Sequence, residues 1–323
     1  PGDSTQVVIE FTLTLGTGSF DRFGRDDESS WWGSGQPLLA WETGVGWARD
    51  RLVGILGETA TSPAARTSVT VLAAADRTVV MTGGASRVGL DADGRMRWYA
   101  ESPAARDVSV SVGRYVVLTR QVGPTQVVVA AAAPAAAEQV MADLTTAISD
   151  LVGFLGPFPF ESLSVARLGD YGGAVEYPGM ILLASPDAGV LVHEVAHMWF
   201  YGMVGDDQGR DPWLDEAFAS YAQGLGHPAP DIGPDQIAEG RGVGLPIGAF
   251  GSATEYFSTV YGKGSTMLAA ARAAAGAPAF DAALRCYLNA NAWRIATPAD
   301  VRAAFADLPA VLDVLVRAGA LPA

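Results

Sequence analysis

The chain has 323 residues, 49% of them hydrophobic and 17% charged, with a formal net charge of -14 and a single cysteine. A chain of this length can bury a substantial core and is expected to form two domains. The acidic excess argues against nucleic acid as a partner, because phosphate binding needs clustered cations; no apolar run approaches the length of a membrane span, and one cysteine excludes an internal disulfide.

Strand signals dominate residues 6–131. β-branched side chains occur there in short runs that often alternate with polar ones, and glycine, proline or aspartate separates the runs. This alternation predicts sheets with one face toward solvent. Residues 19–47 read as irregular, and we interpret Trp31 and Trp32 as packing residues. The predicted strands are residues 7–15, 68–74, 78–82, 108–112, 115–119 and 126–131.

The pattern changes at residues 131–137 to an alanine-rich helical run that begins near Pro134 and ends before Gly156. We therefore divide the chain into a β-rich domain, residues 1–132, and a second domain, residues 133–323. Two strand regions follow this helix, and the remainder is mostly helix-forming, which gives an α+β fold class. The strand regions are residues 163–168 and 173–183, and the clearest later helices are 267–275, 280–289 and 298–305.

The most informative motif is the run of residues 193–197, in which His193 and His197 are four positions apart and Glu194 follows the first. Four residues advance an α-helix by slightly more than one turn, so both imidazoles lie on one face, about 6 Å apart along the axis. Such a pair can hold one metal ion. Glu194 projects roughly 100° away, which suits a residue that holds the metal's water rather than the metal.

A zinc site of this type needs a third protein ligand and an open fourth position. Glu216 is the candidate, since it follows His197 with residues 198–215 between them. Helix-start signals, Ser185 before a proline and Asp211 before another, precede the two segments. Two helices joined by the polar turn 205–210 can pack antiparallel, so Glu216 is expected to face the histidines.

The stretch HEVAHMWFYGMVGDDQGRDPWLDEAFASY resembles the signature of the aminopeptidase N-like gluzincins, the zinc metallopeptidase family that also contains leukotriene hydrolase. Three further segments agree. Residues 173–177 match, imperfectly, the family's glycine-alanine-methionine-glutamate-asparagine strand, with Tyr177 where asparagine is typical. Residues 261–264 match its tyrosine-x-lysine-glycine element, and residues 154–160 resemble the segment that leads into its catalytic domain.

The resemblance implies one zinc ion, held by His193, His197 and Glu216, and a general base, Glu194, that takes a proton from water. It also implies that Tyr261 stabilises the developing oxyanion. The alternative for Tyr261 is an ordinary core aromatic residue.

The resemblance further implies that Glu176, with Gly173 and Ala174, binds the free amino terminus of a peptide substrate. The alternative for Glu176 is an ordinary strand carboxylate. Glu58 is a candidate for a second carboxylate near that amino terminus, and its alternative is a plain loop glutamate.

The implied architecture is the second half of the family's β-saddle domain followed by a thermolysin-like, mainly helical catalytic domain, with the active site in the cleft between them. The family's carboxy-terminal helical-repeat domain is not expected in this chain, and short bacterial relatives favour an exported protein. The implied function is that of a zinc aminopeptidase. A zinc endopeptidase of the same clan and an inactive peptide-binding relative remain open, and the oligomeric state is not predicted.

Overall fold

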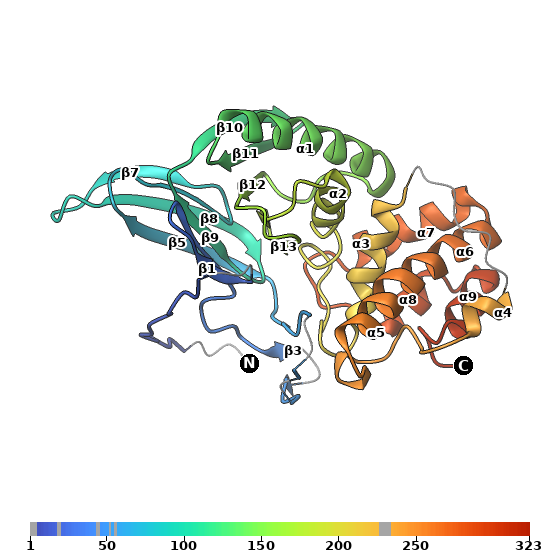
Figure 1. Cartoon of the computed structure of the whole chain (residues 1–323). Helices are drawn as coiled ribbons and strands as arrows, with labels where there is room; N and C mark the ends of the chain where they lie inside the picture. The colour runs from blue at the N-terminus through green and yellow to red at the C-terminus, as the bar shows by residue number, and fades with distance from the viewer. Residues whose placement is uncertain (1–4, 18–20, 43–45, 52, 55–56, 226–233) are drawn as a thin grey trace.

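The computed structural model describes residues 5–17, 21–42, 46–51, 53–54, 57–225 and 234–323. A β-rich part comes first along the chain and a mainly helical part follows (Figure 1). Within the described ranges, no helix combines the length and the apolar character that a membrane crossing requires. The arrangement agrees with the predicted α+β fold class.

Two antiparallel sheets form most of the β-rich part, with strand orders β1-β2-β9-β6 and β5-β8-β7. Apolar side chains from both sheets, among them Val79, Met81, Trp98 and Val110, form one buried cluster that joins them. The strands are β1 (Phe23–Arg25), β2 (Ser29–Gly33), β5 (Ala65–Ala73), β6 (Thr78–Met81), β7 (Ser86–Leu90), β8 (Met96–Ala105) and β9 (Ser109–Gly113), with a separate hairpin of β3 (Trp41–Glu42) and β4 (Gly46–Trp47).

Two predictions for this part are wrong. Residues 7–15 pair with no described strand; instead Leu13 and Leu15 line an apolar cavity of about 570 Å³ together with Val69 and Val71 of β5. The alternation at Leu13 and Leu15 therefore corresponds to side-chain packing without backbone pairing, whereas Val7, Val8 and Ile9 are exposed. The described parts of residues 19–47 are not irregular throughout, because they contain β1 to β4. The packing role of Trp31 is confirmed by its burial.

A third, five-stranded sheet has the order β10-β11-β12-β14-β13. Strand β12 runs parallel to both neighbours, whereas β13 is an antiparallel edge strand. The predicted domain division at residue 132 stays a prediction; β10 and β11 lie before it and share this sheet with strands after it. The bounds are β10 (Val116–Val122), β11 (Thr125–Ala131), β12 (Ser162–Arg167), β13 (Ala174–Tyr177) and β14 (Met180–Leu183).

Helix α1 (Pro134–Leu155) packs along β10 and β11 (Figure 1). It begins with a proline in its first turn and ends before Gly156, whose φ of 103° favours glycine. Both ends agree with the prediction. The later helices are α2 (Ala188–Ala196), α3 (Glu216–Gln223), α4 (Pro234–Ala238), α5 (Ala253–Phe257), α6 (Gly264–Ala275), α7 (Ala277–Ala290), α8 (Pro298–Ala304) and α9 (Pro309–Arg317).

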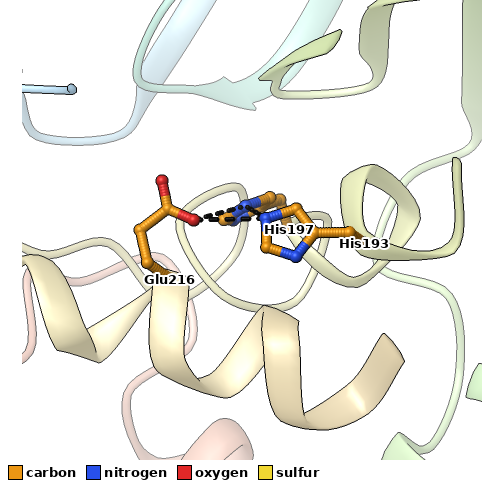
Figure 2. Close-up of side chains that lie close together, drawn as sticks. All are labelled: His193, His197 and Glu216. Atoms are coloured by element: carbon orange, nitrogen blue, oxygen red, sulfur yellow. Dashed lines mark hydrogen bonds and ion pairs between the residues drawn. The ribbon is translucent and has the colours of Figure 1, made fainter. Parts of the chain in front are cut away.

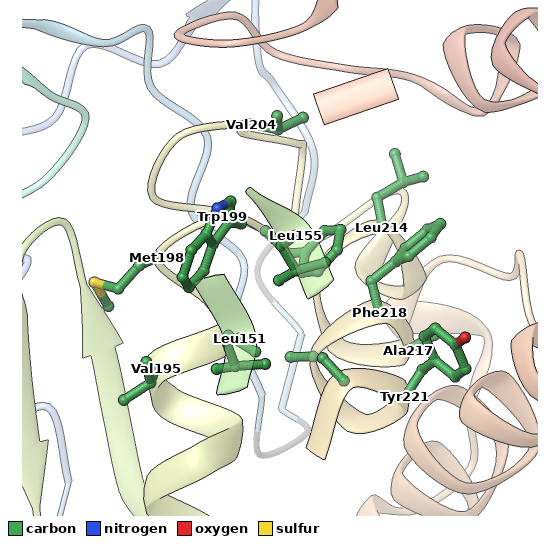
Figure 3. Packing of buried hydrophobic residues seen from close by; sticks show 14 of the residues in the cluster. Leu151, Leu155, Val195, Met198, Trp199, Val204, Leu214, Ala217, Phe218 and Tyr221 are labelled. Carbon is green, nitrogen blue, oxygen red and sulfur yellow. The ribbon is translucent and has the colours of Figure 1, made fainter. Parts of the chain in front are cut away.

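Helices α1, α2 and α3 share one apolar core (Figure 3). Leu151 and Leu155 of α1, Val195 of α2, and Ala217 and Phe218 of α3 are all buried in it. Large-to-small substitutions in such a core lower the free energy of unfolding, because the surrounding side chains move only in part to fill the space. The core therefore fixes the relative position of α2 and α3, the two helices that carry the predicted metal ligands.

Candidate active site

The three predicted metal ligands meet between α2 and α3 (Figure 2). The Nε2 atoms of His193 and His197 lie 3.0 Å apart, and Oε2 of Glu216 is 3.2 Å from the first and 3.3 Å from the second. His193 belongs to α2, His197 is the residue that ends this helix, and Glu216 begins α3. All three side chains are buried.

The helix starts differ from the prediction. The N-cap of α2 is Asp187, whose Oδ1 accepts a hydrogen bond of 2.7 Å from the backbone N–H of Gly189. Ser185 lies two residues too early to cap the helix. Asp211 precedes a short 3₁₀-helix (Pro212–Leu214), and α3 itself is capped by Asp215. In both cases the proline lies outside the α-helix that the sequence pattern assigned to it.

The arrangement of the triad fits a zinc ion. Ligand atoms at about 2.0–2.2 Å from a tetrahedral zinc are about 3.3–3.6 Å from one another, close to the separations found here. The other ring nitrogen of His197, Nδ1, pairs with the backbone oxygen of Phe200 at 3.3 Å. Because a carbonyl oxygen can only accept, Nδ1 donates this hydrogen bond, and Nε2 is the ring nitrogen that faces the triad.

The charges of the triad are strongly coupled. Burial acts to raise the pKa of Glu216, but the adjacent histidines, above all His197, outweigh burial and hold this pKa well below its usual value. Burial likewise opposes protonation of His197, yet the carboxylates of Glu176 and Glu216 raise its pKa well above the ordinary value. Buried negative charge next to imidazole nitrogen makes this position attractive to a cation.

The triad opens into a cavity of about 630 Å³ whose lining comes from both parts of the chain. Ligand sites commonly have volumes of about 300–1,000 Å³. The structure brings every site residue predicted from the sequence into this cavity. They are Glu58, Gly173, Ala174, Glu176, His193, Glu194, His197, Glu216 and Tyr261.

Glu194 follows His193 on α2 and is 5% exposed. Its Oε2 has no hydrogen-bond partner among the described residues. Burial and the neighbouring carboxylate of Glu176 raise its pKa well above the usual value, although His197 opposes this shift. A buried carboxyl group with an unengaged oxygen and a raised pKa is suited to accept and return a proton.

Tyr261 lies on a short π-helix (Ser258–Lys263) between α5 and α6. Its hydroxyl donates a short hydrogen bond to Oε1 of Glu216, and its ring stacks on His193 with centroids 5.7 Å apart. Burial, with the charges of Glu216 and Glu58, raises the pKa of Tyr261 well above its normal value. The hydroxyl therefore keeps its proton and remains a hydrogen-bond donor beside the triad.

Glu176 lies on edge strand β13 and is 4% exposed. The turn before the strand contains Gly172 and Gly173, with φ angles of 82° and 79°. Side chains with a Cβ rarely adopt these angles, so glycine is favoured at both positions. The backbone can then turn sharply into β13 while Ala174 and Glu176 line the cavity.

Arg22, a cavity residue that the sequence reasoning missed, is ion-paired with Glu58 and also donates to the Tyr177 hydroxyl at 3.4 Å. Burial and the charges of Glu176 and Glu216 raise the pKa of Glu58 to about 8, even though Arg22 opposes this. Arg22 was missed because its partners are 36 and 155 residues away along the chain. No local pattern signals such a contact.

Tyr177 stands where the strand of the similar family typically has asparagine, and the structure explains this difference. Tyr177 is fully buried, and its ring packs directly against Gly33 of β2, where any Cβ would collide with it. Tyrosine at the end of β13 therefore links the five-stranded sheet to the β-rich part and meets Arg22 there.

No protein-family model matches the chain. An alignment over 87 positions with aminopeptidase N of Oryctolagus cuniculus is 36% identical, and it covers 22% of this chain and 9% of that protein.

The fold is that of the M1 zinc metallopeptidases, and the predicted fold class and resemblance are confirmed at this level. The crystal structure of the M1 zinc metallopeptidase from Deinococcus radiodurans aligns with a TM-score of 0.67 at 20% identity, over 93% of this chain and 72% of that one. A mutant from the same organism, bound to a Tyr-Ser-Ala substrate, gives 0.65 at 21% identity, over 81% and 66%.

A two-domain M1 zinc metallopeptidase mutant bound to L-arginine gives a TM-score of 0.65 at 20% identity, over 80% of this chain and 65% of that one. The chain thus spans about two thirds of the length of this solved structure and about a tenth of aminopeptidase N.

Proposed function

We propose that the protein is a zinc-dependent aminopeptidase that hydrolyses the N-terminal peptide bond of peptides. The observation that carries the proposal is the closeness of the metal triad to Glu176. Ligand atoms of Glu176, His197 and Asp215 all lie within 4.8 Å of one another. A peptide whose ammonium group pairs with Glu176 therefore has room for little more than its first residue before its carbonyl reaches the triad.

His193, His197 and Glu216 would hold the zinc ion, which when bound supplies Lewis acidity and lowers the pKa of water. Glu194 accepts a proton from the attacking water and delivers it to the leaving amine. Tyr261 retains its proton and turns its hydroxyl from Oε1 of Glu216 to the carbonyl oxygen, to which it donates a hydrogen bond as negative charge develops there. Each of these side chains lines the same cavity.

Substrate binding is proposed to begin at β13. An edge strand offers unpaired backbone groups to an extended peptide, and Glu176 supplies a charge-assisted hydrogen bond to the terminal ammonium. Glu58 contributes a second carboxyl group in this region, in contact with Arg22. Solved relatives of this fold hold L-arginine and a Tyr-Ser-Ala substrate, which supports peptides as the substrate class.

The test is a panel of aminoacyl reporter substrates, free and N-acetylated, with the protein and with Glu194→Gln. We expect cleavage of free-amine substrates only, and a loss of kcat of about a hundredfold or more in Glu194→Gln. Zinc content, measured by elemental analysis, should remain one ion per chain in both. Glu161→Gln, the same change at an exposed position, serves as the control and should keep full activity.

Two outcomes would contradict the proposal. Equal cleavage of acetylated and free substrates would indicate an endopeptidase, because the ammonium contact would then be dispensable. A zinc-loaded protein without turnover on any free-amine peptide would indicate an inactive peptide-binding relative.

A further inference from the structure

Gln208 lies in the loop between α2 and α3 and is 1% exposed. Its side-chain nitrogen Nε2 donates to Oδ2 of Asp215 at 2.9 Å and to Oε1 of Glu176 at 3.3 Å. An amide nitrogen carries two hydrogens, so one group can serve both carboxylates. This orientation of the amide is assigned because an oxygen in that position would face two acceptors, and it leaves Oε1 of Gln208 without a hydrogen-bond partner among the described residues.

Each of these carboxylates supports a different part of the proposed site. Asp215 caps α3, and its Oδ1 accepts a hydrogen bond of 2.7 Å from the backbone N–H of Glu216. Glu176 is the proposed partner of the substrate ammonium. Because Gln208 uses one oxygen of Glu176, the carboxylate keeps its second oxygen for a substrate.

The backbone of Gln208 makes a third connection. Its N–H donates to the carbonyl oxygen of Ala60 at 3.2 Å, two residues after Glu58. The loop itself is held by Asp207, whose Oδ1 accepts from the backbone N–H groups of Gly209 and Arg210 at 3.1 and 3.0 Å. Gln208 thus contacts the segment after Glu58, strand β13 and the start of α3 from one fixed loop.

The electrostatic situation explains why a neutral donor is needed here. Glu176, Asp215, Glu216 and Glu194 are all buried close to one another, and like charges in a buried site repel strongly. A neutral amide satisfies two of these carboxylates without adding charge. Leaving either buried carboxylate without that donor would cost free energy and allow it to move.

We propose that Gln208 is a positioning residue that aligns the ammonium-binding carboxylate of Glu176 with the metal triad, through Asp215 and the start of α3. This role rests on the proposed aminopeptidase function. It predicts effects on substrate affinity and zinc affinity rather than on the proton transfers of Glu194.

The test is Gln208→Met, which keeps the length of the side chain and removes its donor. At saturating zinc, we expect KM for free-amine substrates to rise about tenfold or more, with kcat changed much less. Zinc affinity, measured by competition with a chelator, should fall by about tenfold. Gln139→Met is the control, because Gln139 also donates to a carboxylate, that of Asp143, but on the exposed face of α1.

A double-mutant cycle with Glu176→Gln separates this role from a general structural one. If Gln208 acts through Glu176, Gln208→Met should raise KM little further in the Glu176→Gln background. Additive effects, or a KM within about twofold of the parent in the single variant, would overturn the proposal. Should Gln208→Met fail to fold, Gln208→Asn, too short to reach both carboxylates, gives the same test.

The failure of this inference and that of the proposed function are distinguishable. An unchanged KM and zinc affinity in Gln208→Met, with the parent protein active on free-amine peptides only, would reject the role of Gln208 and leave the function intact. A parent protein without aminopeptidase activity would reject the function, and with it the role of Gln208 in positioning Glu176 for a substrate ammonium.

Discussion

At the scale of single residues, Tyr261 is the side chain whose removal best separates binding from chemistry. Tyr261→Phe removes the hydroxyl beside the triad and keeps the ring that stacks on His193. Loss of one oxyanion donor costs about 10²–10³ in kcat, so we expect a fall of that size with KM little changed. Tyr256→Phe is the control, because the buried Tyr256 hydroxyl has no partner among the described residues. A similar loss in both variants would contradict the role of Tyr261.

Asp211 gives a prediction about pH. Burial and the charge of Asp207 raise its pKa from 3.8 to about 6, although Arg210 opposes this. An acid whose pKa rises on folding binds its proton more tightly in the folded state. Its contribution to the free energy of unfolding therefore falls as the pH rises from about 4 to about 6. Asp211→Asn removes this dependence. The free energy of unfolding of the variant minus that of the parent, from urea unfolding at several pH values, should therefore increase as the pH rises through this window. A decrease would contradict the raised pKa of Asp211.

The sequence predicted the part of the site that depends on local geometry. The two histidines and Glu194 follow from the period of one helix, and the structure brings Glu216 to them. Arg22 and Gln208 carried no such signal. Among their side-chain partners, Glu58 and Glu176 lie 36 and 32 residues away, so these contacts exist only after distant segments have packed together.

At the scale of elements, α1 could be predicted because clear start and stop residues mark its two ends. Strand β8 was not predicted, because its buried and exposed residues differ little in hydrophobicity. Buried positions of β8 include Met96, Trp98, Ala100 and Ser102, and the exposed positions alternate with them. Because alanine and serine at buried positions differ little from solvent-facing residues, the period of two is hard to recognise. Residues 7–15 show the opposite error, since a clear alternation there did not produce a paired strand.

The N-cap of helix α2, Asp187, gives a prediction about stability and zinc affinity. Asp187→Ala removes the acceptor for the Gly189 N–H, and loss of such a cap costs about 1 kcal/mol. We expect a lower free energy of unfolding and, because α2 positions His193 and His197, a weaker zinc affinity. Asp187→Asn keeps an acceptor oxygen and is the matched control. Denaturant unfolding and chelator competition measure the two effects; an unchanged midpoint in Asp187→Ala would show that α2 does not depend on its cap.

At the scale of the whole molecule, Arg106 connects the β-rich part to the helical part. It follows β8, is 4% exposed, and donates to backbone carbonyls of Ser62 at 2.8 Å and of Met203 and Arg294 at 3.3 Å. Burial lowers the pKa of Arg106, while Tyr201 and Asp206 oppose the shift, and the guanidinium stays protonated because arginine does not lose its proton in proteins. One planar side chain thus satisfies carbonyls from segments that are far apart in the sequence.

Substitution of Arg106 should therefore affect both stability and substrate binding. Arg106→Met removes the side-chain donor of the Ser62 carbonyl and the second donor of the Met203 and Arg294 carbonyls, which each keep a backbone partner. It also leaves Asp206 without its cationic neighbour, so we expect the free energy of unfolding to fall by about 1–3 kcal/mol. Arg106→Lys should recover only part of this, since an ammonium cannot reproduce the planar set of donors. Arg114→Met, at an exposed ion pair, should change stability by less than about 0.5 kcal/mol.

The effect on binding follows from where the cavity lies. Glu58 and Arg22 come from the β-rich part, whereas the triad comes from α2 and α3, so looser packing between the parts moves one wall of the cavity relative to the other. In Arg106→Lys, KM for free-amine peptides should rise while the zinc affinity stays near that of the parent. A variant that unfolds more easily yet keeps an unchanged KM would show that the β-rich part contributes stability without shaping the substrate site.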